Sequence, residues 1–280
     1  MAIRQSGSRV PQLGHILLAC FLLMCLHIFS TYAATPIFAS FCPLRLPRLA
    51  LFFIIDLPPT LLLVSLACWL DRRLYRLNDR GVFVRIGYTK ISFRQFLSGF
   101  TLFMLPVATT LVYFQLAGGH IVWNRGFIPR LLFVLTQPGI MEETLYRGFT
   151  LRNLRSRMTV WPAILVSTTM YACCHFRLLG TEWFASPCHS DFFSHLAELY
   201  YYGIILGIIY EWGGYGLPAC ILAHIGSDLS ILCGGSLLAG TPINWWARNG
   251  SHVGMAVGAI LGPIIVWLIY RRRKWRLRTR

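Results

Sequence analysis

Long apolar runs recur along the whole chain, and each approaches the length that crosses a lipid bilayer as a helix, about 20 residues. Of the 280 residues, 56% are hydrophobic and only 13% are charged. A soluble domain carries about 25% charged residues, so composition favours a membrane protein. We expect an all-α fold, a polytopic transmembrane helical bundle of about eight membrane segments with a polar site inside the bundle. The segments are predicted at 13–33, 48–70, 95–117, 127–151, 160–177, 193–211, 217–239 and 252–270.

Basic residues lie between and after these runs, and their distribution predicts the orientation of the chain. Arginine and lysine fill the 71–94 loop and the tail from Arg271 to Arg280, and Arg4 and Arg9 precede the first segment. Because Lys and Arg accumulate at the cytoplasmic ends of membrane segments, we expect both termini in the cytoplasm. The chain would then be a multi-pass protein of the cell membrane, the inner membrane if its source is bacterial.

The net charge of +16 does not by itself indicate binding to nucleic acid. No nucleic-acid recognition module accompanies the charge, and the cations flank apolar runs instead of forming a separate basic domain. Anionic lipid headgroups are the better partner for the basic tail, because they attract clusters of Lys and Arg next to a membrane segment.

Two local patterns predict departures from regular helix. Pro138-Gly139 is expected to break the fourth segment, because proline removes a helical hydrogen bond and clashes with the preceding turn. The 71–94 loop, which contains Arg80-Gly81 and Ile86-Gly87-Tyr88, could hold a small extended element on the inner face of the membrane.

Two further features allow alternative interpretations. The first segment could be a signal peptide with a cleavage site at Tyr32-Ala33-Ala34, but its apolar run favours an uncleaved anchor. Cys42 and Cys188 fall in predicted outer loops and could form a disulfide, although spacing alone does not establish the pairing.

Ionisable residues interrupt three of the apolar segments. The fourth contains Glu142-Glu143-Thr144-Leu145-Tyr146-Arg147, the fifth ends on Tyr171-Ala172-Cys173-Cys174-His175, and the seventh contains His224-Ile225-Gly226-Ser227-Asp228. Ionisable groups inside a membrane are costly to bury and usually serve a function. Three such insertions in three segments suggest one shared site.

The depth of two of these residues supports a joint site. If the fourth and fifth segments form an antiparallel hairpin that turns near Met158-Thr159, Glu142 and His175 each lie about 16 residues, or roughly 24 Å, from the turn. They are therefore expected at similar depth on neighbouring helices.

Helical spacing assigns the acids to different faces. Glu143 and Arg147 are four residues apart and can pair, whereas Glu142 points about 100° away and can address a water. His224 and Asp228 are also four apart. Asp228 could fix the tautomer of His224, or both could contact one water or metal ion.

This residue set suits two kinds of chemistry. It could deprotonate a water for attack on a carbonyl, with histidine stabilising the oxyanion. Alternatively, His175 and His224, with Glu142 and Asp228, could ligate zinc, which activates a bound water; no cofactor is certain. A purely structural interpretation is an ion pair between Glu143 and Arg147 beside hydrogen-bonded core histidines.

At these residues the chain resembles the CAAX prenyl-protease and bacteriocin-processing (CPBP, ABI) family of intramembrane endopeptidases. The family pattern has three parts. They are Glu-Glu-x-x-x-Arg, an aromatic residue four positions before a His, and His-x-x-x-Asn or Asp. Glu142, Glu143 and Arg147 match the first part, His175 the second, with Tyr171 where the family usually has Phe, and His224 and Asp228 the third. The resemblance covers about 127–230.

The resemblance implies that the chain hydrolyses a peptide bond of a membrane-associated protein or peptide. Glu142 would activate the water, and Glu143 and Arg147 would orient that base. His175 and His224 would hold the water and stabilise the oxyanion, aided by Asp228. Both a metal-free glutamate mechanism and a metal-dependent one are compatible with these residues. A proton-coupled transporter, or a non-catalytic immunity or binding protein of the same fold, is the alternative.

We expect three regions along the chain. Residues 1–126 would hold the N-terminal transmembrane segments and a basic cytoplasmic loop, 127–240 the CPBP-like catalytic core, and 241–280 the last transmembrane helix and the Arg-rich cytoplasmic tail.

Motifs of other intramembrane proteases are missing from the sequence, such as the His-Glu-x-x-His of zinc enzymes.

Overall fold

Each of the eight predicted segments overlaps a helix in the computed structural model, which describes residues 11–31, 47–88, 92–116, 127–175, 189–235 and 250–270. The described residues form helices and no strand, which agrees with the predicted all-α class. The elements are α1 (Leu13–Phe29), α3 (Arg48–Leu51), η2 (Phe52–Asp56), α4 (Leu57–Tyr75), α5 (Asp79–Ile86), α6 (Phe93–Leu116), α7 (Phe127–Val134), η3 (Leu135–Glu142), η4 (Thr144–Leu151), α8 (Arg152–Leu154), α9 (Val160–His175), α11 (His189–Trp212), α12 (Leu217–Gly235) and α14 (Gly250–Tyr270). The basic tail, Cys42 and Cys188 lie outside the described residues.

Two helices are long and apolar enough to cross a membrane, Leu49–Tyr75 and Phe93–Leu116, within the described ranges. Leu13–Phe29 and Ala256–Tyr270 are shorter apolar helices. The helix that begins at α7 carries Arg130, Glu142, Glu143 and Arg147, so it is not apolar throughout. The number of eight crossings therefore stays a prediction.

The predicted break at Pro138-Gly139 is wrong. The chain stays helical from Phe127 to Leu154, and Pro138 lies inside η3, one of two successive π-helical stretches. A π-helix bonds each N–H to the carbonyl five residues earlier, and its wider turn accommodates a residue without an N–H. Such turns are frequent at functional sites, and here they hold the Glu142-Glu143 pair.

The extended element expected in the 71–94 loop is also wrong, because residues 79–86 form α5. The side chain of Asn78 caps the helix by accepting a hydrogen bond from the Gly81 N–H at 2.8 Å. Gly87 ends it with a left-handed backbone, φ 108°. These start and stop signals define a short helix within the loop.

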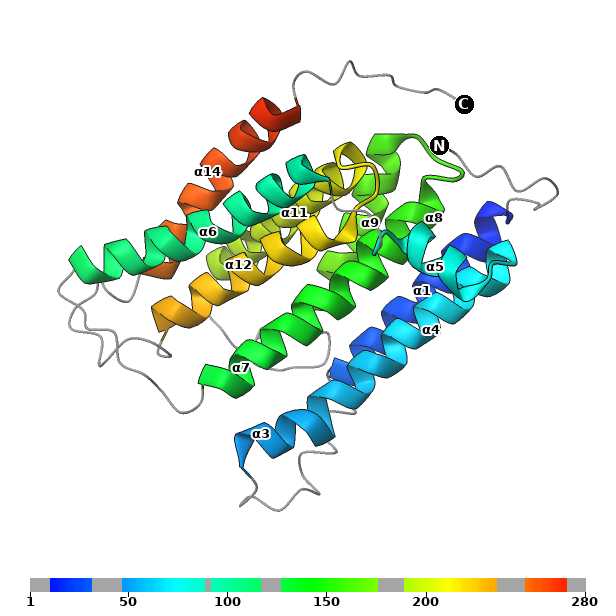
Figure 1. Cartoon of the computed structure of the whole chain (residues 1–280), viewed down its shortest axis with the longest axis horizontal. Coiled ribbons are helices and arrows are strands. Elements are labelled where there is room, and N and C mark those ends of the chain that lie inside the picture. Colours follow the sequence, from blue (N-terminus) through cyan, green and yellow to red (C-terminus); the bar gives the residue numbers. More distant parts are fainter. Residues whose placement is uncertain are drawn as a thin grey trace.

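The helices pack side by side, with α6 lying along both α12 and α14 (Figure 1). Glycines permit the close approach of α6 and α12. A Cβ atom on Gly226 would lie 2.2 Å from the Cα of Phe103, and one on Gly99 would lie 2.7 Å from the carbonyl oxygen of Ala219. Small residues at helix contacts let backbones approach in this way in membrane bundles.

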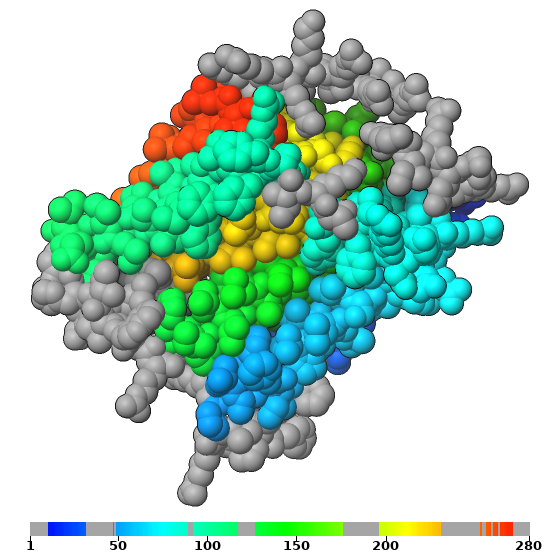
Figure 2. All heavy atoms as spheres, viewed as in Figure 1, coloured from blue at the N-terminus to red at the C-terminus, as the bar shows by residue number. Residues whose placement is uncertain are grey.

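The two π-helical stretches occupy the middle of the bundle. They contact α4 on one side and α12 on the other, and Figure 2 shows the green segment that begins at α7 between the blue α4 and the yellow α12. All eight residues of η4 are buried. Burial on every face holds this segment in place and positions the acids at its start.

Candidate active site

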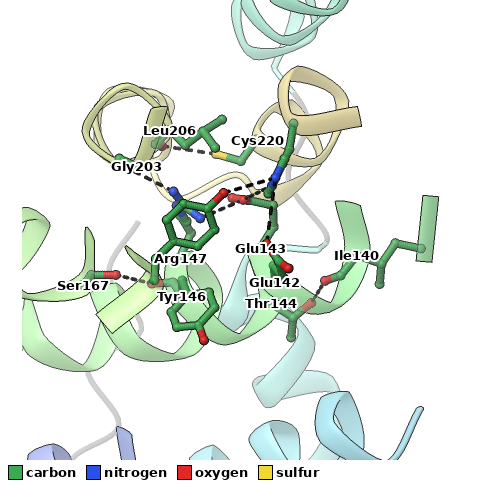
Figure 3. A network of polar contacts seen from close by, with 12 residues as sticks. Ile140, Glu142, Glu143, Thr144, Tyr146, Arg147, Ser167, Gly203, Leu206 and Cys220 are labelled. Atoms are coloured by element: carbon green, nitrogen blue, oxygen red, sulfur yellow. Dashed lines mark hydrogen bonds and ion pairs between the residues drawn. The ribbon is translucent and has the colours of Figure 1, made fainter. Parts of the chain in front are cut away.

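Glu143 is the buried centre of the polar site. One of its oxygens, Oε1, accepts a hydrogen bond from Arg147 Nη1 at 2.8 Å and lies 2.7 Å from His224 Nδ1. Figure 3 shows Glu143 and Arg147 pointing toward each other, with the guanidinium also reaching the carbonyl of Gly203 at 3.4 Å. Glu143 is completely buried and Arg147 is 1% exposed. The pairing makes both charges tolerable, since a buried charge without a partner is strongly destabilising.

Glu142 faces a cavity instead of the ion pair. Its Oε2 atom lies 3.9 Å from the Nε2 atoms of both His175 and His224. Direct hydrogen bonds from nitrogen to oxygen measure about 2.7–3.2 Å, so these separations suit one shared water. Glu142 Oε2 has no direct hydrogen-bond partner among the described residues. The helical geometry thus brings Glu142 and His175 together, at the equal depth that their distances from the turn predict.

The partners of His175 and His224 determine which ring nitrogen faces Glu142 as an acceptor. His175 Nδ1 lies 3.0 Å from the carbonyl oxygen of Tyr171, which only accepts hydrogen bonds. His224 Nδ1 lies 2.7 Å from the carboxylate of Glu143. Each Nδ1 therefore carries the proton, and in the neutral ring each Nε2 is an acceptor.

Asp228 does not fix the tautomer of His224, contrary to one of its two predicted roles. The Nδ1 of His224 is bound by Glu143, and Asp228 Oδ1 lies 4.0 Å from the other nitrogen, Nε2. Asp228 therefore belongs to the group that surrounds the reactive side of His224. The carboxylate that orients the ring comes from another helix, at a sequence distance of 81 residues.

Tyr171 joins the site through both its ring and its hydroxyl. The ring lies 4.6 Å from the His175 ring, and the Arg147 guanidinium carbon lies 4.7 Å from its centroid. The hydroxyl lies 3.4 Å from His224 Nε2 and can donate to it. Tyr171 thus contacts Arg147, His175 and His224.

A cavity of about 570 Å³ opens beside these groups. Glu142, His175, His224 and Asp228 line it together with apolar residues such as Phe133 and Leu199. Its mixed wall, with a few convergent polar groups, is typical of a ligand site. Glu143 and Arg147 are not among its lining residues and support it from behind.

The donor set fits a zinc ion in its chemistry. Nε2 of His175, Nε2 of His224 and Oε2 of Glu142 are the atoms that zinc prefers, and the bond from His224 Nδ1 to Glu143 matches the carboxylate–histidine arrangement of zinc sites. Among the described residues, no group of three His, Cys, Asp or Glu is close enough to form a ready metal cluster.

His27 and Tyr146 also belong to the site, and motif reasoning missed them. His27 Nε2 lies 3.9 Å from Glu142 Oε1, and its Nδ1 lies 2.8 Å from the hydroxyl of Tyr146. The signal was present, because His27 is an ionisable residue in an apolar segment, the criterion that singled out Glu142. No spacing rule connects it to Glu142 across 115 residues.

Comparison with known proteins finds a family match for one part of the chain. Residues 124–230 match a family described as type II CAAX prenyl endopeptidase Rce1-like. The match contains Glu142, His175, His224 and Asp228 but not α1. A search of curated proteins found no match.

Proposed function

Because residues 124–230 match the Rce1-like family of type II CAAX prenyl endopeptidases, we propose that this chain hydrolyses a peptide bond of a membrane-associated protein or peptide. The family and the apolar helices support a protease of the membrane. We further propose that the chain crosses the membrane several times with both termini in the cytoplasm. The observation that carries the catalytic proposal is the placement of two imidazole Nε2 atoms at 3.9 Å from one carboxylate oxygen of Glu142.

Glu142 is the proposed base. A water between Glu142 Oε2 and the imidazoles gives its proton to the carboxylate while its oxygen attacks the carbonyl carbon of the scissile peptide bond. The carbonyl becomes a tetrahedral oxyanion. Glu142 then returns the proton to the departing amine, and the C–N bond breaks. The products are a new carboxylate and a new amino terminus.

His224 is the proposed stabiliser of the oxyanion, with His175 beside it. A hydrogen bond from Nδ1 to a carboxylate makes an imidazole more basic at its other nitrogen. His224 has such a bond to Glu143, so its Nε2 can take up a proton and donate to the oxyanion. Glu143 and Arg147 act through His224 and hold it in position. Asp228 lies close enough to favour the protonated, charged form of His224.

A zinc-dependent version of the reaction would use the same residues. His175, His224 and Glu142 would hold the ion, which supplies a Lewis acid that lowers the pKa of a bound water. In either version the protein excludes bulk water with the apolar cavity wall and orients the rings through Tyr171 and Glu143.

The proposal is tested by comparing new amino termini in membranes from cells that produce the wild type, Glu142→Gln or Asp79→Asn. Peptide hydrolysis creates an α-amine, which amine labelling and mass spectrometry detect for any substrate. Asp79→Asn is the matched acid-to-amide control, because Asp79 is exposed and pairs only with Arg72 among the described residues. We expect loss of the general base to lower cleavage by about 100-fold or more.

Two results would contradict the proposal. Cleavage that persists in Glu142→Gln removes Glu142 as the base. If wild-type and Glu142→Gln membranes contain the same termini, and reconstituted vesicles show pH-dependent flux instead, the chain is a transporter.

A further inference from the structure

His27 places a third imidazole at the site, from a helix outside the family match. It lies on α1, is 3% exposed, and lines the cavity with Glu142. Its Nε2 faces Glu142 Oε1 at 3.9 Å, while His175 and His224 face the other oxygen, Oε2. The carboxylate of Glu142 is therefore contacted by imidazoles at both oxygens.

His27 differs from the other two histidines in what binds its Nδ1. The partners of His175 and His224 are a carbonyl and a carboxylate, which only accept and so leave Nε2 without a proton in the neutral ring. The partner of His27 is the hydroxyl of Tyr146 at 2.8 Å, and a hydroxyl can donate. Only for His27, among these three, can the neutral ring carry its proton on Nε2.

A third residue can complete that arrangement, although its thiol also has the carbonyl oxygen of Met24 as an acceptor at 3.9 Å. Cys174 Sγ lies 2.6 Å from the Tyr146 hydroxyl oxygen, and a thiol is a donor. If the thiol donates to Tyr146, the hydroxyl proton is directed to His27 Nδ1. The His27 proton then lies on Nε2 and points toward Glu142 Oε1. Cys174, Tyr146 and His27 are all buried, so bulk water does not compete for these bonds.

We propose that His27 is a positioning residue whose Nε2–H holds Glu142 Oε1 through one water, and so leaves Oε2 turned toward His175 and His224. The inference rests on the proposed function, because Glu142 is the base there. It adds α1 to the active site and assigns Tyr146 and Cys174 the task of selecting the His27 tautomer.

A packing role makes different predictions. α1 contacts α9 and α4, and His27 could merely fill space between them. In that case any side chain of similar volume would serve, and the tautomer of His27 would not matter. Variants that keep or remove one hydrogen-bonding position at similar size separate the two roles.

The kinetic test uses a quenched fluorescent peptide copied from the strongest cut site found in the amino-terminus comparison. His27→Gln keeps an N–H donor near the Nε2 position, whereas His27→Asn reaches only the Nδ1 position. We expect His27→Asn and His27→Ala to lower kcat by about 10- to 100-fold at unchanged KM, the size of a hydrogen bond to a charged group. His27→Gln should retain kcat within about 5-fold, and thermal unfolding reports whether each variant is folded.

The spectroscopic test reads the tautomer itself. The chain has 8 histidines, so uniform ¹⁵N-histidine labelling gives few signals, and those of His27 are assigned by their loss in His27→Gln. We expect a protonated Nε2 and an unprotonated Nδ1 for His27, and a changed Nδ1 signal in Tyr146→Phe, which loses the hydrogen bond to that nitrogen. A protonated Nδ1 in the wild type overturns the proposal.

The outcomes also separate this inference from the proposed function. If Glu142→Gln abolishes cleavage while His27→Asn cleaves like the wild type, only the role of His27 is wrong. If wild-type protein produces no new amino termini, the protease proposal fails, and the ¹⁵N spectrum still decides the tautomer of His27.

Discussion

Glu143 and His224 lie on different helices, 81 residues apart, and are joined by a hydrogen bond of 2.7 Å. The same Glu143 oxygen accepts from Arg147, so one buried carboxylate oxygen anchors both the structural ion pair and the imidazole beside the proposed water. A structural and a functional interpretation of Glu143 are therefore compatible. The ion pair makes the buried acid tolerable, and the acid orients the histidine.

Breaking the ion pair from one side should destabilise the protein more than removing it completely. Arg147→Met leaves Glu143 buried without its cation, and the expected loss is about 3–5 kcal/mol of unfolding free energy. The double variant Glu143→Gln/Arg147→Met removes both charges and should recover part of that loss. Thermal unfolding in detergent measures both effects. A double variant less stable than Arg147→Met would contradict this account.

The Tyr171 hydroxyl should contribute a modest amount to the reaction. Tyr171→Phe keeps the ring against His175 and Arg147 but loses the hydroxyl 3.4 Å from His224 Nε2. We expect a decrease in cleavage rate of about 2- to 10-fold, the size of one neutral hydrogen bond. Cleavage of the same fluorescent peptide gives the measurement. An unchanged rate would show that the hydroxyl is not used.

Gly226→Ala should destabilise the bundle, because the new Cβ would lie 2.2 Å from the Phe103 Cα. The backbones of α6 and α12 must separate to admit it, at a cost of about 1–3 kcal/mol. Gly14→Ala is the matched control, since a Cβ there meets nothing within 4 Å. Comparison of the two unfolding temperatures tests the close approach. Equal temperatures would exclude it.

The mature protein should retain α1. This helix contributes the buried side chains of Ile16, Cys20 and Leu23 to the core and His27 to the cavity. Removal of a signal peptide after Ala34 would remove all four. Mass spectrometry of the purified protein should therefore recover peptides from 13–29. An amino terminus beyond residue 34 would contradict both this prediction and the role of His27.

The sequence predicts local features of this protein well. Apolar run length located the helices, and residue counts from one turn placed Glu142 and His175 at equal depth, because helical rise is constant. The i,i+4 rule predicted the pair of Glu143 and Arg147. The predicted helix break at Pro138-Gly139 was wrong, because buried surroundings on both sides favour a wider helical turn over a break. The expected extended element in the 71–94 loop was also wrong, because Asn78 and Gly87 start and stop the helix α5 there.

By itself, the sequence determined an all-helical chain with apolar segments, a Glu-Glu-x-x-x-Arg motif on one helix and histidines on two others. Such features follow from neighbours within a few residues, where backbone geometry leaves little freedom. Only the tertiary structure decided that Glu143, not Asp228, holds Nδ1 of His224, and that His27 of α1 faces Glu142. Contacts between distant helices depend on how whole surfaces pack, and no local period encodes which faces meet.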